Sequence, residues 1–329
     1  MLVTLRNVFS PQNVMSSLGL LPDLKTSIID SFYKQRPTHN SPMIGLDTIT
    51  DVVGTIPVVG RDSLPVPVAN EVHDVQFIAP LPVKPSITVT ASELNDMKAL
   101  LNNTYGLENW RKQKIDKLRK IVRDTTEAMA SVQLMTGKVN WPRRLSHSSG
   151  NYYVDFGSPL TYTPAAKLAA TSTITDLWNI CEAMAEVINQ NGIGGNIEFM
   201  AGKEAFAMIV RMAESYKSRA GGHISISLEN GKVNVGGHII HKMTENYPSP
   251  ADGTWVPKVN PKSLVAVAVE VDGYIWYCAI DSITARNPAV PFYVVPEQMP
   301  GDVGIELIGQ SKPLPARHPK SVCSAVVVG

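Results

Sequence analysis

Between residues 41 and 90 the apolar residues follow no helical pattern. Valine and isoleucine occur in short runs separated by prolines at positions 43, 57, 65, 67, 80, 82 and 85. Proline fixes φ and lacks a backbone donor, so helix is excluded over most of this segment. Ser86–Thr90 alternates as a strand does, and Gly60–Ser63 has the composition of a turn. The pattern predicts a long extended ribbon, which is marginally stable unless it lies on another surface.

The following segment has the spacing of a long amphipathic helix. Thr90 and Glu93 have capping-box spacing and predict a first helix toward Leu101, which Tyr105-Gly106 is expected to break. From Leu107 to Gly137, which predicts the helix end, about thirty residues at 1.5 Å rise span roughly 45 Å. Apolar or small residues recur there at steps of three and four: Leu118, Val122, Thr125, Met129, Val132 and Thr136. The sequence therefore predicts a helix longer than most in globular proteins.

The rest of the chain is predicted to form shorter helices and strands. Short helices are expected after Ser10-Pro11 and within Leu24–Phe32, a loop at Trp141–Arg144, and a strand at Tyr152–Phe156. Beyond these, Asn230-Gly231 is a strong hairpin signal. A second strand pair, Ser263–Val271 with Tyr274–Ile280, is expected across Asp272-Gly273. We expect the last strands to return to the long helix, because a helix with one apolar face must be covered.

These elements predict an α+β chain in five parts. The parts are an N-terminal arm (1–40), an extended loop (41–90), a part that contains the long helix (91–162), an α/β part (163–296) and C-terminal strands (297–329). No internal repeat is visible. Residues 41–137 have little core of their own, which favours a protein that packs against copies of itself over a free globular enzyme.

Composition excludes several classes of protein. Hydrophobic residues make up 44% of the chain and charged residues 18%, which is typical of a globular protein. Lysine and arginine total 30 against 29 acids, so nucleic-acid binding would need a local patch. No apolar run approaches the length of a membrane span, and the N-terminus lacks the pattern of a signal peptide. The distant cysteines Cys181, Cys278 and Cys323 are expected to be buried thiols.

None of the candidate catalytic, phosphate-binding or metal-binding motifs is complete. Gly202-Lys203 lies between a strand and a helix but lacks the first glycine of a phosphate loop. His238 and His241 should face opposite sides of a strand, which disfavours a shared metal. The polar run Ser146–Gly150 has no nucleophile elbow around it. We therefore predict no catalytic residue, no cofactor and no metal site.

One charged cluster remains. Thirteen residues hold seven bases and a single acid, Asp116; the bases are Arg111, Lys112, Lys114, Lys117, Arg119, Lys120 and Arg123. On a helix they cover the sides away from the apolar stripe. Two interpretations stay open: a solvated or ion-paired face between subunits, and a surface that binds phosphates of packaged nucleic acid without reading bases.

In order and pattern these parts resemble the HK97-type fold of tailed-phage major capsid proteins, and within it the lambda-like major capsid protein E family. Leu24–Tyr33 resembles the apolar segment before the family's extended loop, and Thr125–Lys138 resembles the end of its long helix. Asn196–Lys217 is similar to its strand–turn–helix, and Ile305–Val328 to its closing strands. The likeness covers most of the chain, although no short invariant motif defines the family.

The resemblance implies a structural protein with an HK97-type capsid fold. Residues 41–90 would be the E-loop, an extended β-hairpin over the adjacent subunit. Residues 107–137 would be the spine helix of the peripheral domain, and residues 163–296 the axial domain. Hexamers and pentamers would close an icosahedral shell around double-stranded DNA.

The resemblance also implies partners. The protein would belong to the virion and assemble in the host cytoplasm, with a portal and optionally a decoration protein. No long coiled-coil scaffolding segment is visible at the N-terminus, which implies a separate scaffolding protein. Two alternatives stay open: an encapsulin-like compartment that holds protein cargo, and a soluble oligomeric enzyme whose site the sequence does not disclose.

Overall fold

The chain folds into two compact units. The computed structural model describes residues 9–45, 77–100, 104–144, 149–217, 224–282 and 288–329. The first unit comprises Met1–Ile44, Ala79–Met129 and Tyr274–Pro315; the second comprises Gly45–Ile78, Ala130–Gly273 and Ala316–Gly329. The five-part division expected from the sequence stays a prediction.

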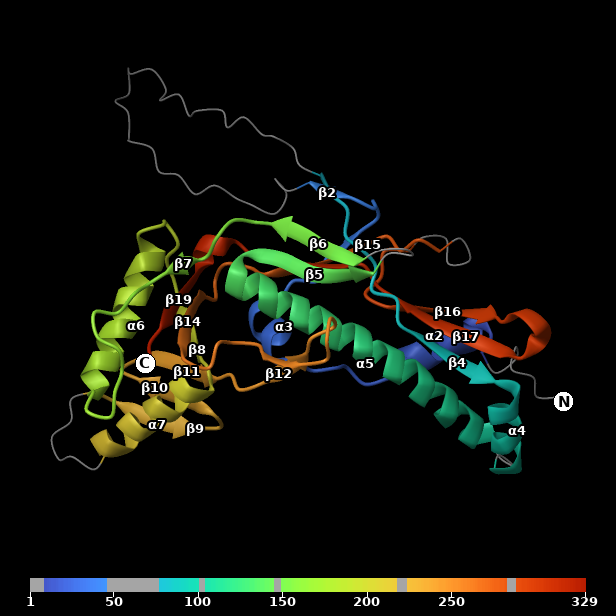
Figure 1. The fold of residues 1–329 in the computed structure, drawn as a ribbon, viewed down its shortest axis with the longest axis horizontal. Helices are drawn as coiled ribbons and strands as arrows, with labels where there is room; N and C mark the ends of the chain where they lie inside the picture. Colours follow the sequence, from blue (N-terminus) through green and yellow to red (C-terminus); the bar gives the residue numbers. More distant parts are fainter. Residues whose placement is uncertain (1–8, 46–76, 101–103, 145–148, 218–223, 283–287) are drawn as a thin grey trace, which may run out of the picture. The chain divides into compact units, whose positions relative to one another are not determined.

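A mixed seven-stranded sheet organises the second unit (Figure 1). Its order is β7-β19-β14-β8-β11-β10-β9. The bounds are β7 Leu160–Thr161, β8 Ile197–Ala201, β9 Ile226–Glu229, β10 Lys232–Val235, β11 His238–Lys242, β14 Ser263–Ala268 and β19 Val322–Val326. Strand β8 pairs parallel with β11 and antiparallel with β14, so the sheet's centre is mixed.

Two helices cover one face of this sheet. Helix α6 (Ile174–Asn189) begins with a capping box at Thr173, and α7 (Lys203–Lys217) follows β8. The core beneath them combines alternate residues of the strands with the apolar helix stripes, for example Phe199, Leu264, Ala266 and Cys323 with Leu177, Met184 and Ile209. The strand–turn–helix and the hairpin predicted here are confirmed. Asn230 and Gly231 both adopt positive φ in the turn between β9 and β10.

The first unit is built around two three-stranded sheets. One sheet has the order β16-β17-β4; its strands are β16 Tyr293–Gln298, β17 Gly304–Gln310 and β4 Ser86–Thr90. The other sheet has the order β1-β15-β18; its strands are β1 Thr38–His39, β15 Tyr274–Cys278 and β18 Pro313–Ala316. A short 3-10 turn follows Met299 in this unit, and another follows His318 in the second unit. Leu118 and Trp110 of the long helix pack with Val89 and Leu307 in the core of this unit.

Short helices lie along the start of the chain. Helix α2 (Pro11–Gly19) begins at Ser10, whose side chain accepts from the Asn13 N–H at 3.3 Å. Helix α3 (Ser27–Phe32) follows, and its buried side is Ile28, Ile29 and Phe32. Helix α4 (Ala91–Leu100) begins after Thr90, whose hydroxyl accepts from the Glu93 N–H. Each of these starts agrees with the sequence signals.

The long helix is confirmed, with one correction at its start. Helix α5 spans Thr104–Thr136, 33 residues, and ends where Gly137 takes φ 67°. The predicted break at Tyr105-Gly106 is wrong, because both residues lie inside α5. Glycine costs about 1 kcal/mol relative to alanine in a helix. The buried Trp110 and the stripe that follows outweigh that penalty.

Two other local predictions are wrong. Trp141–Arg144 was expected to be a loop but belongs to β5 (Lys138–Arg144), which pairs antiparallel with β6 (Ser149–Asp155). Proline is tolerated there because this sheet has two strands, both of them edges. Strands β14 and β15 do not pair across Asp272-Gly273. Strand β14 pairs with β8 and β19, whereas β15 pairs with β1.

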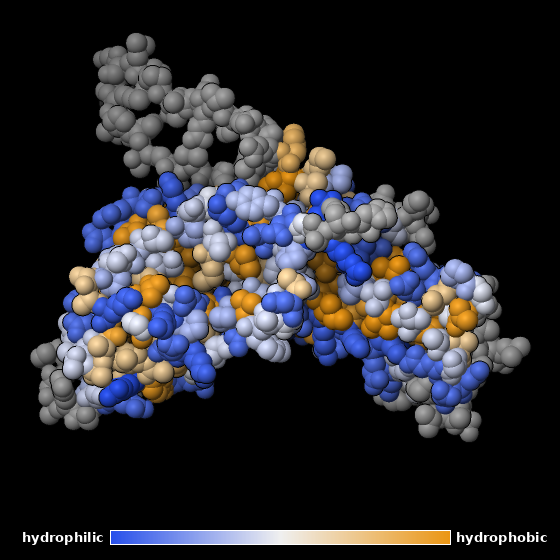
Figure 2. All heavy atoms as spheres, in the orientation of Figure 1, coloured by the Kyte–Doolittle hydropathy of each residue, from blue (hydrophilic) through white to orange (hydrophobic). Residues whose placement is uncertain are grey.

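Two short strands within the predicted extended loop pair with each other. Strand β2 (Ile44–Gly45) pairs with β3 (Phe77–Ile78) in a two-stranded sheet. The Gly60–Ser63 turn and the valine and isoleucine runs between positions 46 and 76 lie outside the described residues, as do residues 1–8 and Ser146–Ser148. The predicted strand Ser86–Thr90 is confirmed as β4. The side chains of Met43 and Phe77 are 48% and 68% exposed, and apolar surface gathers around β2 in Figure 2. We call Met43 and Phe77 the loop foot.

Among the helices that the structure describes, none has both the length and the apolar character that crossing a bilayer would require.

Candidate functional site

Several bases of the predicted cluster hold neighbouring helices against α5. Arg111 is 8% exposed, and its Nε donates to Ser17 Oγ of α2 at 2.8 Å. Lys114 Nζ lies 2.5 Å from Glu93 Oε1 of α4 and 5.9 Å from the centre of the Trp110 ring. These two bases therefore contact other helices of their own unit.

Two arginines bind the segment that leads into α3. Arg123 Nη2 donates to Asp30 Oδ1 at 2.7 Å. Arg119 Nη2 donates to Asp116 Oδ1 at 3.0 Å and to the Pro22 carbonyl at 2.5 Å. The two guanidinium side chains are 11% and 16% exposed, respectively. They also line a cavity of about 260 Å³ beside α5. This part of the cluster is therefore largely buried within the subunit.

Asp30 is the acid on which this contact depends. Its carboxylate accepts from Arg123, from Arg36 and from the Thr26 N–H. Burial disfavours its charged form, but the Thr26 hydrogen bond and the two arginine charges outweigh burial and lower the pKa of Asp30 below 3.8. Asp30 is therefore ionised at neutral pH and bridges the two arginines.

A buried carboxylate completes the attachment of α3. Glu127 is 2% exposed, and its two oxygens accept from the N–H groups of Ile28 and Ile29 at 2.7 and 2.9 Å. Oε1 also accepts from Ser27 Oγ at 3.0 Å. The first N–H groups of a helix have no acceptor within that helix. Here the Glu127 carboxylate, which belongs to α5, is the acceptor for the first N–H groups of α3. The sequence pattern around Glu127 does not reveal this role, because nothing local marks a side chain that caps a helix about a hundred residues away.

Three lysines of the cluster remain more open. Lys120 is 58% exposed on its side chain and lies 2.7 Å from Asp116. Lys117 is exposed and Lys112 half-buried. Within the described part of the chain neither Lys112 nor Lys117 has an ion-pair partner. Four of the seven bases therefore bind other segments of the unit: Arg111, Lys114, Arg119 and Arg123. Among the described residues the other three, Lys112, Lys117 and Lys120, form no ion pair with another segment.

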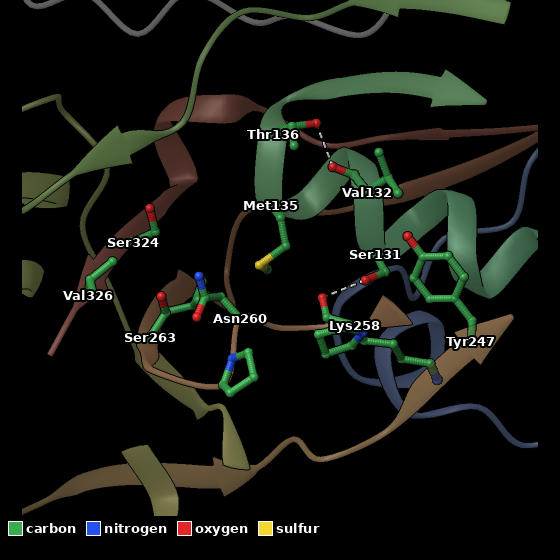
Figure 3. Close-up of a pocket in the computed structure, with 13 residues that line it drawn as sticks. Ser131, Val132, Met135, Thr136, Tyr247, Lys258, Asn260, Ser263, Ser324 and Val326 are labelled. Atoms are coloured by element: carbon green, nitrogen blue, oxygen red, sulfur yellow. Dashed lines mark hydrogen bonds between the residues drawn. The ribbon is translucent and has the colours of Figure 1, made fainter. Parts of the chain in front are cut away.

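A cavity of about 490 Å³ lies in the second unit, beside the last turns of α5 and strands β14 and β19 (Figure 3). Ser131 Oγ donates to the Lys258 carbonyl, and Thr136 Oγ1 to the Val132 carbonyl, both at 2.7 Å. Met135 points into the space between them and the sheet. The described lining contains no aspartate, glutamate, histidine or cysteine. Its serine and threonine hydroxyl groups therefore have no carboxylate or imidazole beside them in that lining to act as an activating base.

The glycine before α7 has a packing role. A Cβ on Gly202 would lie 2.1 Å from the Asn260 carbonyl oxygen, so the close approach requires glycine. The N–H groups of Glu204 and Ala205 both donate to the Pro261 carbonyl at 2.9 Å. The first amides of α7 are thus already bound, and Lys203 is exposed. Close packing against Asn260 therefore explains why a glycine precedes α7, and no bound phosphate is needed to explain it.

The remaining candidates do not converge on one site. His238 Nε2 lies 2.9 Å from Glu182, whereas His241 Nε2 lies 2.8 Å from Glu198. The described residues contain no cluster of His, Cys, Asp or Glu suited to a metal ion. All three cysteines are buried. Burial raises the pKa of the Cys181 thiol, and it raises those of Cys278 and Cys323 to about 11. Neutral buried thiols are poor nucleophiles.

The comparisons with known proteins agree on one fold. A family model described as phage major capsid protein E matches residues 10–327. A solved structure assigned as a prophage capsid protein of E. coli CFT073 is 16% identical, with a TM-score of 0.65 over 97% of this chain and 99% of that one. A phage-related protein from Bordetella bronchiseptica RB50 is 13% identical, with a TM-score of 0.55 over 97% of each chain. No curated protein matches the sequence.

Proposed function

Because this chain belongs to the phage major capsid protein E family, we propose that it forms hexamers and pentamers that close an icosahedral shell around double-stranded DNA. The observation that carries the proposal is the extent of the family match, which covers residues 10–327. Membership makes the chain a structural capsid protein rather than an enzyme. It confirms the α+β, HK97-type capsid fold expected from the sequence.

The extended loop would fasten neighbouring subunits. The residues that flank its positions 46–76 pair as β2 and β3, so Gly45 and Phe77 belong to neighbouring strands. The loop foot exposes two large apolar side chains where the legs begin. Apolar surface of this kind is stabilised when another protein covers it. We assign that cover to the adjacent subunit of the same capsomer.

The lysines of α5 are our candidates for contact with DNA. Lys112 and Lys117 have no ion-pair partner among the described residues and Lys120 pairs with Asp116 of its own helix, whereas the arginines of the cluster bind the start of the chain. Contacts of lysine with phosphate are independent of base sequence and weaken as salt rises. The packaged DNA would therefore be held non-specifically, and the arginines would serve folding.

The proposal includes other partners. A separate scaffolding protein and a portal would accompany the subunit during assembly in the host cytoplasm, and a decoration protein is optional. As a member of a capsid family the chain is a component of the virion.

Isolation of particles after expression tests the proposal. We expect shells that sediment as closed particles and, when formed with the other phage proteins, protect double-stranded DNA from nuclease. Particles that contain protein cargo and no DNA in the phage-infected cell would support the encapsulin-like alternative instead. Absence of any closed particle would contradict both.

Deletion of the loop is the sharper test. Residues 46–76 can be replaced by a short Gly-Ser linker, because β2 and β3 already bring the two ends together. The deletion must stop before β4, which pairs with β17 in the sheet of the first unit. We expect a folded subunit that forms no shells. Phe77→Ser is the matched control for loss of apolar surface alone, and shells from the deleted chain would refute the fastening role.

A further inference from the structure

A small hairpin of the second unit presents an unusual side chain. Strands β12 (Asn246–Pro248) and β13 (Trp255–Pro257) pair with each other and with no other described strand. Trp255 is 71% exposed, more than any other large hydrophobic side chain in the described residues. Tryptophan is usually largely buried, and exposed tryptophan is enriched at protein–protein contacts. This exposure requires an explanation.

Backbone hydrogen bonds order the hairpin that carries Trp255. At the tip, the Ser249 and Gly253 N–H groups donate to the Thr254 and Ser249 carbonyls, both at 2.8 Å. At the base, the Lys258 N–H donates to the Glu245 carbonyl at 2.9 Å. A backbone that is already ordered loses less entropy on binding than a loose loop does. The hairpin that carries Trp255 is therefore prepared for contact.

The two faces of the hairpin differ. Tyr247, which is opposite Val256, lies with its ring centre 6.0 Å from that of Trp141 in β5. Trp255 is opposite Pro248 in the register, so its side chain belongs to the other face. One face thus packs on the subunit, and the other remains for a partner.

Beside Trp255 lies a groove of about 650 Å³. Its floor includes Phe206, Met243 and Pro257, and its described lining holds Lys203 and Lys242 but no acid. Neither lysine has an ion-pair partner within the described residues. The nearby carboxylate of Glu245 is bound to Lys258 Nζ at 2.5 Å. An apolar floor with unpaired lysines fits an apolar side chain that is flanked by a carboxylate. We call this surface the Trp255 groove.

We propose that the Trp255 groove binds a segment of a second copy of this chain. The proposal rests on the shell-forming function above, because subunits in a ring contact one another through two different patches. The chain as a whole is nearly neutral, with 30 bases and 29 acids, so a basic groove leaves acidic surface elsewhere on the same chain. The partner copy can therefore supply the carboxylate.

The β16–β17 hairpin is an example of such acidic surface. Glu297 and Glu306 lie directly opposite each other in its register, and Val303 near its tip is 58% exposed. Like charges across a strand pair repel each other, and a lysine from another molecule relieves that repulsion. The chain thus carries apolar-acidic surfaces of the kind that the Trp255 groove fits.

Assembly of variants tests this contact. Trp255→Ala should raise the subunit concentration needed for shell formation by about tenfold or more, as loss of a buried aromatic anchor does. Leu228→Ala, which removes another exposed apolar side chain of the same unit, is the matched control and should assemble normally. Both variants should keep the unfolding midpoint of the unmodified subunit. Normal assembly of Trp255→Ala would overturn the proposal.

Charge reversal and cross-linking identify the partner. The double variant Lys203→Glu and Lys242→Glu should assemble poorly, with partial recovery at high salt, whereas Lys232→Glu should not. With a photoreactive benzoylphenylalanine in place of Trp255, assembled shells should give cross-links between two copies of the chain. Cross-links only to a different protein would overturn the proposal. If the unmodified protein forms no shells at all, the proposed function itself fails.

Discussion

The two halves of α5 are buried in different ways. In the N-terminal half the buried residues follow a stripe, Ile115, Leu118 and Val122, and charged side chains flank it. In the C-terminal half six consecutive residues, 126 to 131, are all buried, and they include Thr126 and Glu127. An amphipathic pattern describes the first half and fails for the second.

The difference lies in how polar groups are satisfied. The N-terminal half contacts its unit through long basic side chains, whose partners range from the buried Ser17 to the partly exposed Asp30 and Glu93. The C-terminal half has polar groups that cannot reach water and bind specific backbone atoms instead. Gln133 Nε2 donates to the Arg317 carbonyl at 3.0 Å, and Ser131 Oγ binds the Lys258 carbonyl. Buried polar groups are costly when unpaired, so the C-terminal half should tolerate less change.

The largest effect is expected from Glu127→Ala. The change leaves the buried N–H groups of Ile28 and Ile29 without their acceptor and should lower the free energy of unfolding by about 3 kcal/mol. Denaturant unfolding of the unassembled subunit measures it. Gln113→Ala, on the exposed side of α5, is the control and should change stability by less than about 0.5 kcal/mol. Equal effects of the two variants would remove the proposed distinction between the halves.

A smaller effect is expected from Gln133→Met. Methionine keeps the volume but removes the donor to the Arg317 carbonyl, which should cost about 1–2 kcal/mol. The loss would appear in the unfolding transition that reports the second unit. Thr136→Ala, an exposed position in the same turn, should cost less. A neutral Gln133→Met would mean that the buried amide contributes nothing beyond its packing.

The smallest effect concerns the ion pairs of the N-terminal half. The folded pKa of Asp30 lies below its unfolded value of 3.8, so its contribution to stability is present above that pH. It is lost as the pH falls through the folded pKa. The stability difference between the unmodified protein and Asp30→Asn should therefore be present at pH 7 and vanish in acid. A difference that is independent of pH would show that charge is not the cause.

Local patterns predicted much of the fold. The Ser10 and Thr90 helix starts, the Asn230-Gly231 hairpin and the end of α5 at Gly137 all depend on neighbouring residues, and all are confirmed. The predicted pairing across Asp272-Gly273 is wrong because pairing is decided by distant strands. Strand β14 pairs with β19, more than fifty residues later in the chain.

The candidate site was less predictable for the same reason. Sequence spacing located the seven bases but not their partners. Arg111, Arg119 and Arg123 bind groups 94 to 97 residues earlier in the chain. The surroundings of Trp255 were equally invisible, because its exposure depends on strands that meet only in the folded chain. Function was recognised from the order of whole elements, since no single motif carries it.

Electron microscopy of the purified, unmodified protein tests the central claim most directly. The account predicts closed icosahedral shells built from hexamers and pentamers of this chain, with the extended loop of each subunit lying on its neighbour. Discrete small oligomers, with no shells across a wide range of protein and salt concentrations, would contradict it.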